Sequence, residues 1–173
     1  MKKSFPLFVR VLLILALLSL TACASTVTTI NQWATSGTAS SEFDATSWSA
    51  QQATGAPDTA TCGDQTTAWA SHGTDAIETL SLSYSTQVYA TQAVIYISYH
   101  PTYVTMVELQ DSNGTYHSVY TASPQTMMTC PYQLTINIPK TSYLVKGLRI
   151  TIDQTTLNDW SEIDAVQLVG TNK

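Results

Sequence analysis

Short segments in which apolar and polar residues alternate fill most of the chain beyond residue 79 of its 173 residues. Leu80, Leu82 and Tyr84 alternate with serines, and comparable segments recur about every ten residues. The chain shows no three-to-four-residue apolar repeat of the kind that indicates an amphipathic helix. This pattern predicts an all-β fold, a single antiparallel β-sandwich of the jelly-roll type. The predicted strands cover residues 80–84, 93–99, 104–110, 116–120, 132–138, 148–153 and 163–169.

Two stretches of the pattern predict the position of individual strands. Residues 94–97 are apolar on both faces, which is typical of a strand in the centre of a sheet. The run Asp-Ser-Asn-Gly from Asp111 to Gly114 is a hairpin-turn signal between two predicted strands. We therefore expect the strands on either side of this turn to pair with each other.

The start of the chain has the order of an export signal. Basic residues come first, an apolar run of about ten residues follows at 11–20, and Leu-Thr-Ala-Cys ends it at Cys23. Such a run is too short to span a bilayer, which needs about 20 residues. Its last four residues resemble the lipobox of bacterial lipoproteins, in which the cysteine becomes the mature first residue and carries lipid. The alternative is an ordinary cleaved signal that happens to contain a cysteine.

The lipobox resemblance divides the chain into three parts. We expect a lipoprotein signal peptide at 1–22, a lipidated flexible tether at 23–32 and a folded domain at 33–173. Two or more acyl chains, palmitate among them, anchor a protein stably, whereas one does so only weakly. The mature protein is therefore expected to be extracytoplasmic and held by its lipid at the bacterial cell membrane or outer membrane.

Removal of the signal leaves a strongly acidic chain. Four basic residues then face twelve acidic ones, a formal net charge of −8. Nucleic acid is excluded as a partner, because binding to its phosphates requires clustered lysine and arginine. The acid excess suits divalent cations or neutral ligands better than anionic ones.

Two cysteines, Cys62 and Cys130, remain once Cys23 is assigned to lipid. An even pair in an exported protein predicts a disulfide. It would close a loop of about 68 residues and, on the chain-entropy model, stabilise the fold by roughly 4 kcal/mol. The alternatives are a metal pair or a Cys/His nucleophile, although the three histidines are scattered and show no ligand spacing.

The stretch from Trp48 to Trp69 breaks the strand pattern and carries most of the candidate chemistry. It contains glycines, a proline, several hydroxyl side chains, Cys62 and the carboxylates of Asp58 and Asp64. Carboxylate, hydroxyl and backbone carbonyl oxygens are the ligands that a hard cation needs. We expect a folded loop that wraps such a cation and braces one end of the sandwich. The alternative is a plain structural loop that caps the core.

Two sequence motifs resemble a known superfamily. Residues 63–69, Gly-Asp-Gln-Thr-Thr-Ala-Trp, are similar to the Gly-Asp-x-x-Thr-x-Trp segment of galactose-binding-like jelly rolls. This group includes discoidin and coagulation-factor C-type domains and many carbohydrate-binding modules. The last predicted strand begins with an acidic residue, Glu162, as it does in that group.

Longer segments resemble one branch more closely. Residues 48–58, 89–96 and 99–109 look like the jelly-roll modules of pappalysin-type metalloproteases. Together the similarities cover roughly residues 33–170, and they imply a galactose-binding-like jelly roll. The catalytic zincin domain of those proteases carries a His-Glu-x-x-His helix, and this run does not occur in the sequence.

The superfamily resemblance also implies a structural calcium ion. In discoidin-like domains the loop before the tryptophan and the acidic residue of the last strand often hold such an ion. By position, Asp64, Thr67 and Glu162 are then the side-chain ligands, with Asp58 as a further candidate. The alternative is that Asp64 caps its own turn and that Glu162 pairs with Arg149 or faces water.

Three residues of one turn are the expected ligand-binding residues. Tyr99, His100 and Tyr103 surround Pro101, which interrupts a strand and should expose two phenols and an imidazole. In sandwich lectins an aromatic ring at the loop end usually stacks on a sugar. The tryptophans Trp48, Trp69 and Trp160 are expected to fill the core near the loop, although Trp48 and Trp160 are also candidates for such stacking.

These observations predict a membrane-anchored binding module and not an enzyme. The expected ligand is carbohydrate or a surface polymer, the expected cofactor is structural calcium, and no organic cofactor is expected. The alternative is a structural or protein–protein interaction module of a cell-envelope assembly. The sequence contains no nucleophile elbow, phosphate-binding loop or dinucleotide fingerprint that would indicate catalysis.

Overall fold

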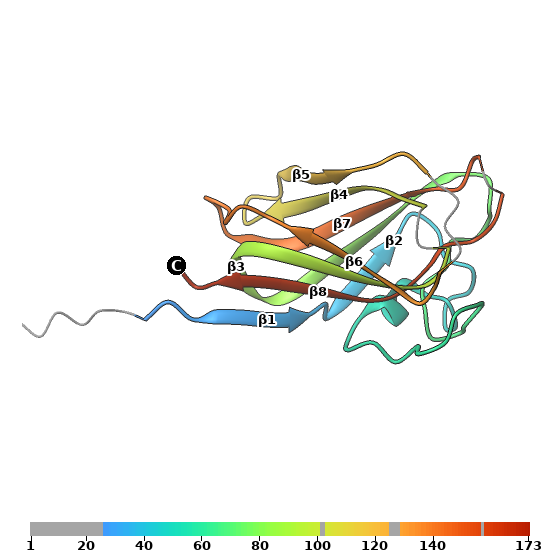
Figure 1. Ribbon diagram of the computed structural model, residues 1–173, viewed down its shortest axis with the longest axis horizontal. Coiled ribbons are helices and arrows are strands. Elements are labelled where there is room, and N and C mark those ends of the chain that lie inside the picture. Colours follow the sequence, from blue (N-terminus) through green and yellow to red (C-terminus); the bar gives the residue numbers. More distant parts are fainter. Residues whose placement is uncertain (1–25, 101–102, 125–128, 157) are drawn as a thin grey trace, which may run out of the picture.

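In the computed structural model of the protein, residues 26–100, 103–124, 129–156 and 158–173 are described. These residues form antiparallel β-strands and one 3₁₀ helix, which confirms the predicted all-β class (Figure 1). The predicted signal peptide and Cys23 lie outside the described residues. The elements are β1 (Thr29–Trp33), β2 (Ser36–Ala39), η1 (Ala50–Ala53), β3 (Ile77–Tyr99), β4 (Val104–Asp111), β5 (Tyr116–Thr121), β6 (Tyr132–Asn137), β7 (Val145–Asp153) and β8 (Glu162–Thr171).

The long strand β3 belongs to both layers of a sandwich. Its first half pairs with β2 and β7, and β4 and β5 continue that layer beyond β7. Its second half pairs with β8 and β6, and β1 lies beyond β8. The pairing with β7 shifts between Ser83 and Val88, where β3 passes from one layer to the other. This arrangement confirms the predicted antiparallel jelly-roll sandwich (Figure 1).

The core lies between the two layers and is built by strand alternation. Leu80 and Leu82 in the first half of β3, and Ile95 and Ile97 in its second half, are buried. Successive side chains of a strand point to opposite faces, so this spacing puts the four residues on the inner faces. Burying a side chain of this size contributes about 1.5–3 kcal/mol.

The predicted central strand and the predicted hairpin are both confirmed. Residues 94–97 pair with β6 on one side and with β8 on the other, so this stretch lies in the centre of its layer. The turn between β4 and β5 closes when the Gly114 N–H donates to the Asp111 carbonyl (3.0 Å). Gly114 has φ of 95°, a backbone conformation that favours glycine. The predicted strands 80–84 and 93–99 are parts of one strand, β3.

The folded domain begins earlier than the sequence predicts. Strand β1 starts at Thr29, inside the segment expected to be a flexible tether, and it pairs with β8 from Thr29 to Trp33. The boundary between residues 32 and 33 is therefore four residues too late. A short edge strand rich in polar residues lacks the apolar alternation that reveals an inner strand. No helix in the described segments is long and apolar enough to cross a membrane.

The two ends of the sandwich differ in content. At one end β1 begins and β8 finishes, and the Thr28 N–H donates to the Asn172 side chain (2.9 Å). At the opposite end the β2–β3 loop meets the β7–β8 loop, and Tyr99 at the end of β3 pairs with Glu162 at the start of β8 (Figure 1). We call this second end the loop end.

Candidate functional site

The Trp48–Trp69 loop is bound to the start of the last strand. Trp69 and Ile163 exchange two backbone hydrogen bonds, of 2.8 and 3.0 Å. The Trp69 indole is fully buried and donates from Nε1 to the Ser41 carbonyl (3.1 Å). The loop therefore braces one end of the sandwich, and its local structure includes the short 3₁₀ helix η1.

Two carboxylates of β8 hold the same loop through its backbone. Glu162 Oε2 accepts a hydrogen bond from the Gln65 N–H (3.0 Å). The two oxygens of Asp164 accept from the N–H groups of Asp58 and Thr59, each at 3.3 Å. Glu162 and Asp164 are only 2% and 3% exposed, and as alternate residues of a strand they lie on the same face. Sequence reasoning missed Asp164, although a second acid two residues after Glu162 was a readable signal.

Burial gives these acids unusual proton affinity. Burial first, and then the neighbouring Asp64 carboxylate, raise the pKa of Glu162 to about 8. Burial also raises the pKa of Asp164. A desolvated carboxylate beside another negative charge is stabilised by a proton or by a cation.

The four predicted calcium ligands fall into two groups. Asp64 lies beside Glu162, as the prediction requires, whereas the Thr67 hydroxyl bonds to the Thr59 hydroxyl (2.6 Å). The Asp58 side chain also lies at the Thr59 hydroxyl. Within residues 26–173, apart from the segments not described, no group of three or more His, Cys, Asp or Glu side chains could hold a metal.

The donor set at Asp64 and Glu162 fits a calcium ion in part. The two carboxylates are hard oxygen donors, but calcium takes 6–8 oxygens, so carbonyls or water would have to supply the others. Neither carboxylate takes the alternative role considered above. Asp64 Oδ1 accepts from Trp48 Nε1 (2.8 Å), and Arg149 pairs with Glu108 and not with Glu162. Calcium binding stays a prediction.

Cys62 and Cys130 form a disulfide, with their Cα atoms 5.0 Å apart. It ties the Trp48–Trp69 loop to the segment before β6. The predicted pairing is confirmed, and the metal-pair and nucleophile alternatives do not apply to these two residues.

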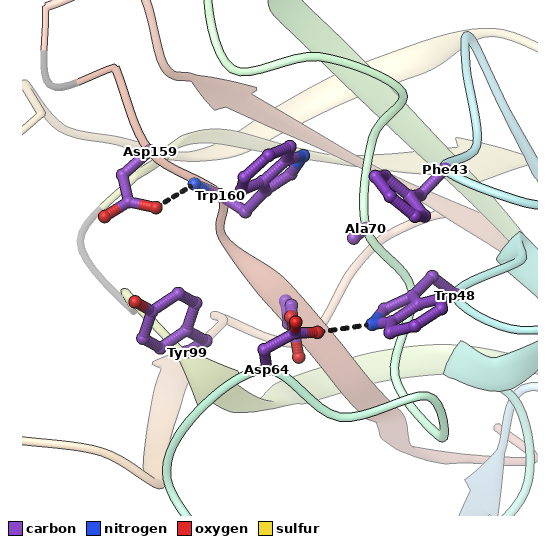
Figure 2. Close-up of a pocket in the computed structure, with 8 residues that line it drawn as sticks. Phe43, Trp48, Asp64, Ala70, Tyr99, Asp159 and Trp160 are labelled. Carbon is purple, nitrogen blue, oxygen red and sulfur yellow. Dashed lines mark hydrogen bonds between the residues drawn. The ribbon is translucent and has the colours of Figure 1, made fainter.

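A cavity of about 270 Å³ opens at the loop end (Figure 2). Its aromatic walls meet edge to face. The Phe43 ring centroid lies 5.1 Å from that of Trp48 and 5.9 Å from that of Trp160. The lining residues are Phe43, Trp48, Asp64, Ala70, Tyr99, Asp159, Trp160 and Glu162. We call this the loop-end cavity.

Both indoles of the cavity are held by their N–H groups. Trp48 Nε1 donates to Asp64, and Trp160 Nε1 donates to the Ser71 carbonyl (3.1 Å). Because the protein already satisfies these donors, the indoles offer the cavity their carbon surfaces. Both side chains are half-buried, and Phe43 is 46% exposed. The expectation that the tryptophans fill the core therefore holds for Trp69 alone.

Unfavourable backbone conformations gather around the same cavity. In the described part of the chain, the non-glycine residues with positive φ are Trp48 (54°), His100 (39°) and Asn158 (51°). Trp48 lines the cavity, and the other two directly flank the lining residues Tyr99 and Asp159. A bulky residue in this region costs free energy, and such residues cluster at functional sites.

The three predicted ligand-binding residues have different positions. Tyr99 lines the loop-end cavity, whereas His100 lies behind it and donates from Nδ1 to the Trp160 carbonyl (2.9 Å). Tyr103 is only 3% exposed and stacks on the His100 ring at 5.5 Å, so the expectation that its phenol is exposed is wrong. The Tyr103 side chain is buried because the aromatic rings of this turn pack on one another.

The cavity is acidic as well as aromatic. Asp64, Asp159 and Glu162 line it. Burial, followed by the negative charges of these three carboxylates, raises the pKa of the Tyr99 phenol. Sequence reasoning missed Phe43 and Asp159, because only folding brings the loop with Phe43 and Trp48 beside the loop with Asp159 and Trp160.

The fold is an antiparallel jelly-roll β-sandwich with an aromatic and acidic cavity at its loop end. Residues 21–173 match the family model of the C-terminal SD scarf domain of Pappalysin-1, and the chain belongs to this family. The resemblance noted in the sequence is thereby confirmed. The search of curated proteins gives no match.

Solved structures with this fold include several binding modules. The family 32 carbohydrate-binding module from C. perfringens NanJ, solved with galactose, matches with a TM-score of 0.58 and 17% identity, over 81% of this chain and 99% of that one. A chitosan-binding module of a Paenibacillus chitosanase/glucanase matches with 0.55 and 17%, over 78% and 92%. An F5/8 type C domain from Bacteroides fragilis matches with 0.57 and 15%, over 82% and 93%. At these identities the likeness establishes the fold.

Proposed function

We propose that this protein is a lipid-anchored, non-catalytic module that binds carbohydrate in its loop-end cavity. The observation that carries the proposal is that aromatic rings and carboxyl groups line the same cavity at the loop end. A sugar ring has apolar C–H faces, which pack on aromatic rings, and hydroxyl groups, which donate to carboxylates. The half-buried rings of Trp48 and Trp160 are the surfaces that would take the sugar.

The structural neighbours support this class of ligand. Their names give galactose for the C. perfringens NanJ module and chitosan for the Paenibacillus module. Another C. perfringens module of the same fold was solved with a galactose-containing disaccharide (TM-score 0.54, 11% identity, 83% of this chain and 89% of that one). These names give the ligands of those modules and not of this chain. The sugar that this chain binds has to be found by experiment.

The layout of the domain agrees with an anchor at Cys23. Thr29, the first residue of β1, lies six positions after Cys23, a stretch that can span at most about 22 Å. β1 begins at the end opposite the loop end (Figure 1). A lipid on Cys23 would thus hold the terminal end near the membrane and leave the loop-end cavity facing away from it.

Titration with glycans tests the proposal. The purified domain should bind at least one glycan of an array, and Trp160→Ala should weaken that binding about tenfold or more because a stacking surface is lost. Trp33→Ala is the matched control, because Trp33 packs edge to face against Tyr96 in β3 and lies outside the cavity. No binding to any glycan at millimolar concentration would overturn the proposal and favour a protein-interaction module.

A further inference from the structure

Three acidic residues and no lysine or arginine line the loop-end cavity. Its carboxylates come from three residues, and the basic residues of the described part lie elsewhere. Arg149 pairs with Glu108 (2.7 Å), and Lys146 donates to a carbonyl of the β4–β5 turn (3.3 Å). Lys140 donates to the carbonyl of Lys173, at the end where the chain finishes. The cavity therefore lacks a lysine or arginine to balance its acids.

The lining has few free hydrogen-bond donors. Both indole N–H groups are already donated, to Asp64 and to the Ser71 carbonyl. The lining contains no amide or guanidinium side chain. Tyr99 has a hydroxyl donor, and Glu162, with its pKa of about 8, has one when it is protonated. The carboxylates of Asp64 and Asp159 only accept when they are ionised, so they fit a ligand that brings donors.

Asp159 is the carboxylate best placed to meet a charged donor. One oxygen accepts from the backbone N–H of Trp160 (2.9 Å), which fixes the Asp159 side chain at the rim of the cavity (Figure 2). The other oxygen lies 3.7 Å from His100 Nδ1, and that nitrogen donates instead to the Trp160 carbonyl. With its side chain 42% exposed, Asp159 can accept from a ligand without opening the fold.

Aromatic faces beside a carboxylate form a favourable environment for an ammonium group. A cation over a tryptophan or tyrosine face is attracted by the ring, and an adjacent carboxylate adds a charge-assisted hydrogen bond. The volume of about 270 Å³ lies just below the range of about 300–1,000 Å³ of sites for drug-sized ligands, so it suits one small ring.

We propose that the loop-end cavity takes an amino sugar whose amine is a free ammonium group, paired with Asp159 and packed against Trp160. The ammonium has three donors, of which the Asp159 carboxylate can accept one or more, and acetylation of the amine would remove its charge. This inference rests on the proposed carbohydrate-binding function and names the class of sugar.

Calorimetric titration with two disaccharides tests it. The β-1,4-linked disaccharide of glucosamine and its N-acetylated counterpart share their rings and linkage, and only the first carries ammonium groups. At about pH 6 the amine is charged, and about 0.15 M salt screens attraction between a cationic ligand and the acidic surface. The amine form is expected to bind at least about tenfold more tightly.

Two aspartate variants locate the effect. Asp159→Asn keeps an acceptor for the backbone N–H of Trp160 but removes the carboxylate charge. Affinity for the amine form should therefore fall about tenfold. Asp153→Asn is the matched control, because Asp153 bonds to Thr155 at the end of β7 and does not line the cavity. It should bind like the wild type.

Each outcome separates the two proposals. Equal or tighter binding of the N-acetylated sugar overturns the ammonium proposal and leaves carbohydrate binding intact. Equal losses in Asp159→Asn and Asp153→Asn mean general charge attraction and also overturn it. The absence of binding to either disaccharide, with neutral glycans bound on the array, overturns it as well, whereas an array without any ligand overturns both proposals.

Discussion

Glu162, the first residue of the last strand, holds the loop by a hydrogen bond. Burial of its carboxyl group disfavours ionisation. Its Oε2 accepts from the Gln65 N–H, and it lies beside Asp64. A residue in this position links the local structure of the loop to the pH of the medium, because its charge state differs between the folded and unfolded chain.

At neutral pH, Glu162→Gln should stabilise the domain relative to wild type. The pKa of Glu162 is near 4.5 in the unfolded chain and about 8 in the folded one, so between these values the unfolded state loses its proton first. The free energy of unfolding therefore falls as pH rises through this window, by at most about 1.4 kcal/mol per pH unit from this group. The glutamine keeps an acceptor for Gln65 but does not titrate.

Thermal unfolding from about pH 4 to pH 9 in EDTA measures this difference. The decline in Tm with rising pH should be shallower in Glu162→Gln than in the wild type. Identical slopes would mean that Glu162 ionises in the folded state as easily as in water, which would contradict the effect of its burial.

Calcium, if held by Asp64 and Glu162, should reverse that pH effect. Calcium chloride is then expected to raise the Tm of the wild type above its value in EDTA, since a ligand that binds only the folded state stabilises it. Its affinity should increase from about pH 6 to pH 8 as Glu162 loses its proton. Asp64→Asn should abolish the shift, and such an ion would leave Asp159 free for the sugar.

Asp153→Asn serves as the control for calcium too, because it removes an equal charge outside the cavity. A wild type whose Tm does not respond to calcium, or an Asp64→Asn variant that responds as strongly as the wild type, would remove calcium from the description of this protein.

At the scale of elements, the β-sandwich depends on tying an irregular loop to a strand that follows about 95 residues later. Backbone pairing of Trp69 with Ile163, the carboxylates of Glu162 and Asp164, and the disulfide of Cys62 all act on this loop. Together they fix the side chains that form one wall of the loop-end cavity.

Replacing both cysteines by serine should lower stability without changing the fold. A separation of 68 residues corresponds to roughly 4 kcal/mol of unfolded-state entropy on the chain-entropy model. Denaturant unfolding should show this loss for the double variant, Cys62→Ser with Cys130→Ser, and for the reduced wild type alike. A double variant as stable as the oxidised protein would show that the core and the loop contacts suffice.

At the scale of the whole molecule, the two ends of the sandwich have separate tasks in the proposed function. Strand β1 begins at the end where β8 finishes (Figure 1). The aromatic and acidic residues that line the loop-end cavity lie at the other end. An anchor at the end where β1 begins would therefore not obstruct a ligand in the loop-end cavity.

Cys23→Ser should release the protein from the membrane fraction while leaving its affinity for glycan unchanged. Fractionation of cells and titration of the released protein measure the two properties separately. Ser25→Ala is a control that keeps the cysteine. A Cys23→Ser protein that stays with the membrane would contradict the lipid anchor, and altered affinity would contradict the separation of the two ends.

Sequence alone determined the class of the fold and the contacts of its most patterned parts. Alternation in several strands reflects one wet and one buried face, so the all-β class could be read directly. The central strand at 94–97 could be read from its continuous apolar run. The Gly-Asp-x-x-Thr-x-Trp segment and Glu162 were likewise expected to meet, and they do. Strand β1 carried no such alternation, which is why its start at Thr29 was missed.

Only the tertiary structure decided which side chains share the loop-end cavity. Phe43, Trp48, Asp159 and Trp160 belong to loops whose meeting depends on long-range pairing of β3 with β7 and β8. Local periodicity reports which face of a strand is buried, but it carries no information on which loops converge. For the same reason the sequence could not tell that Tyr103 is buried while Trp160 faces the cavity.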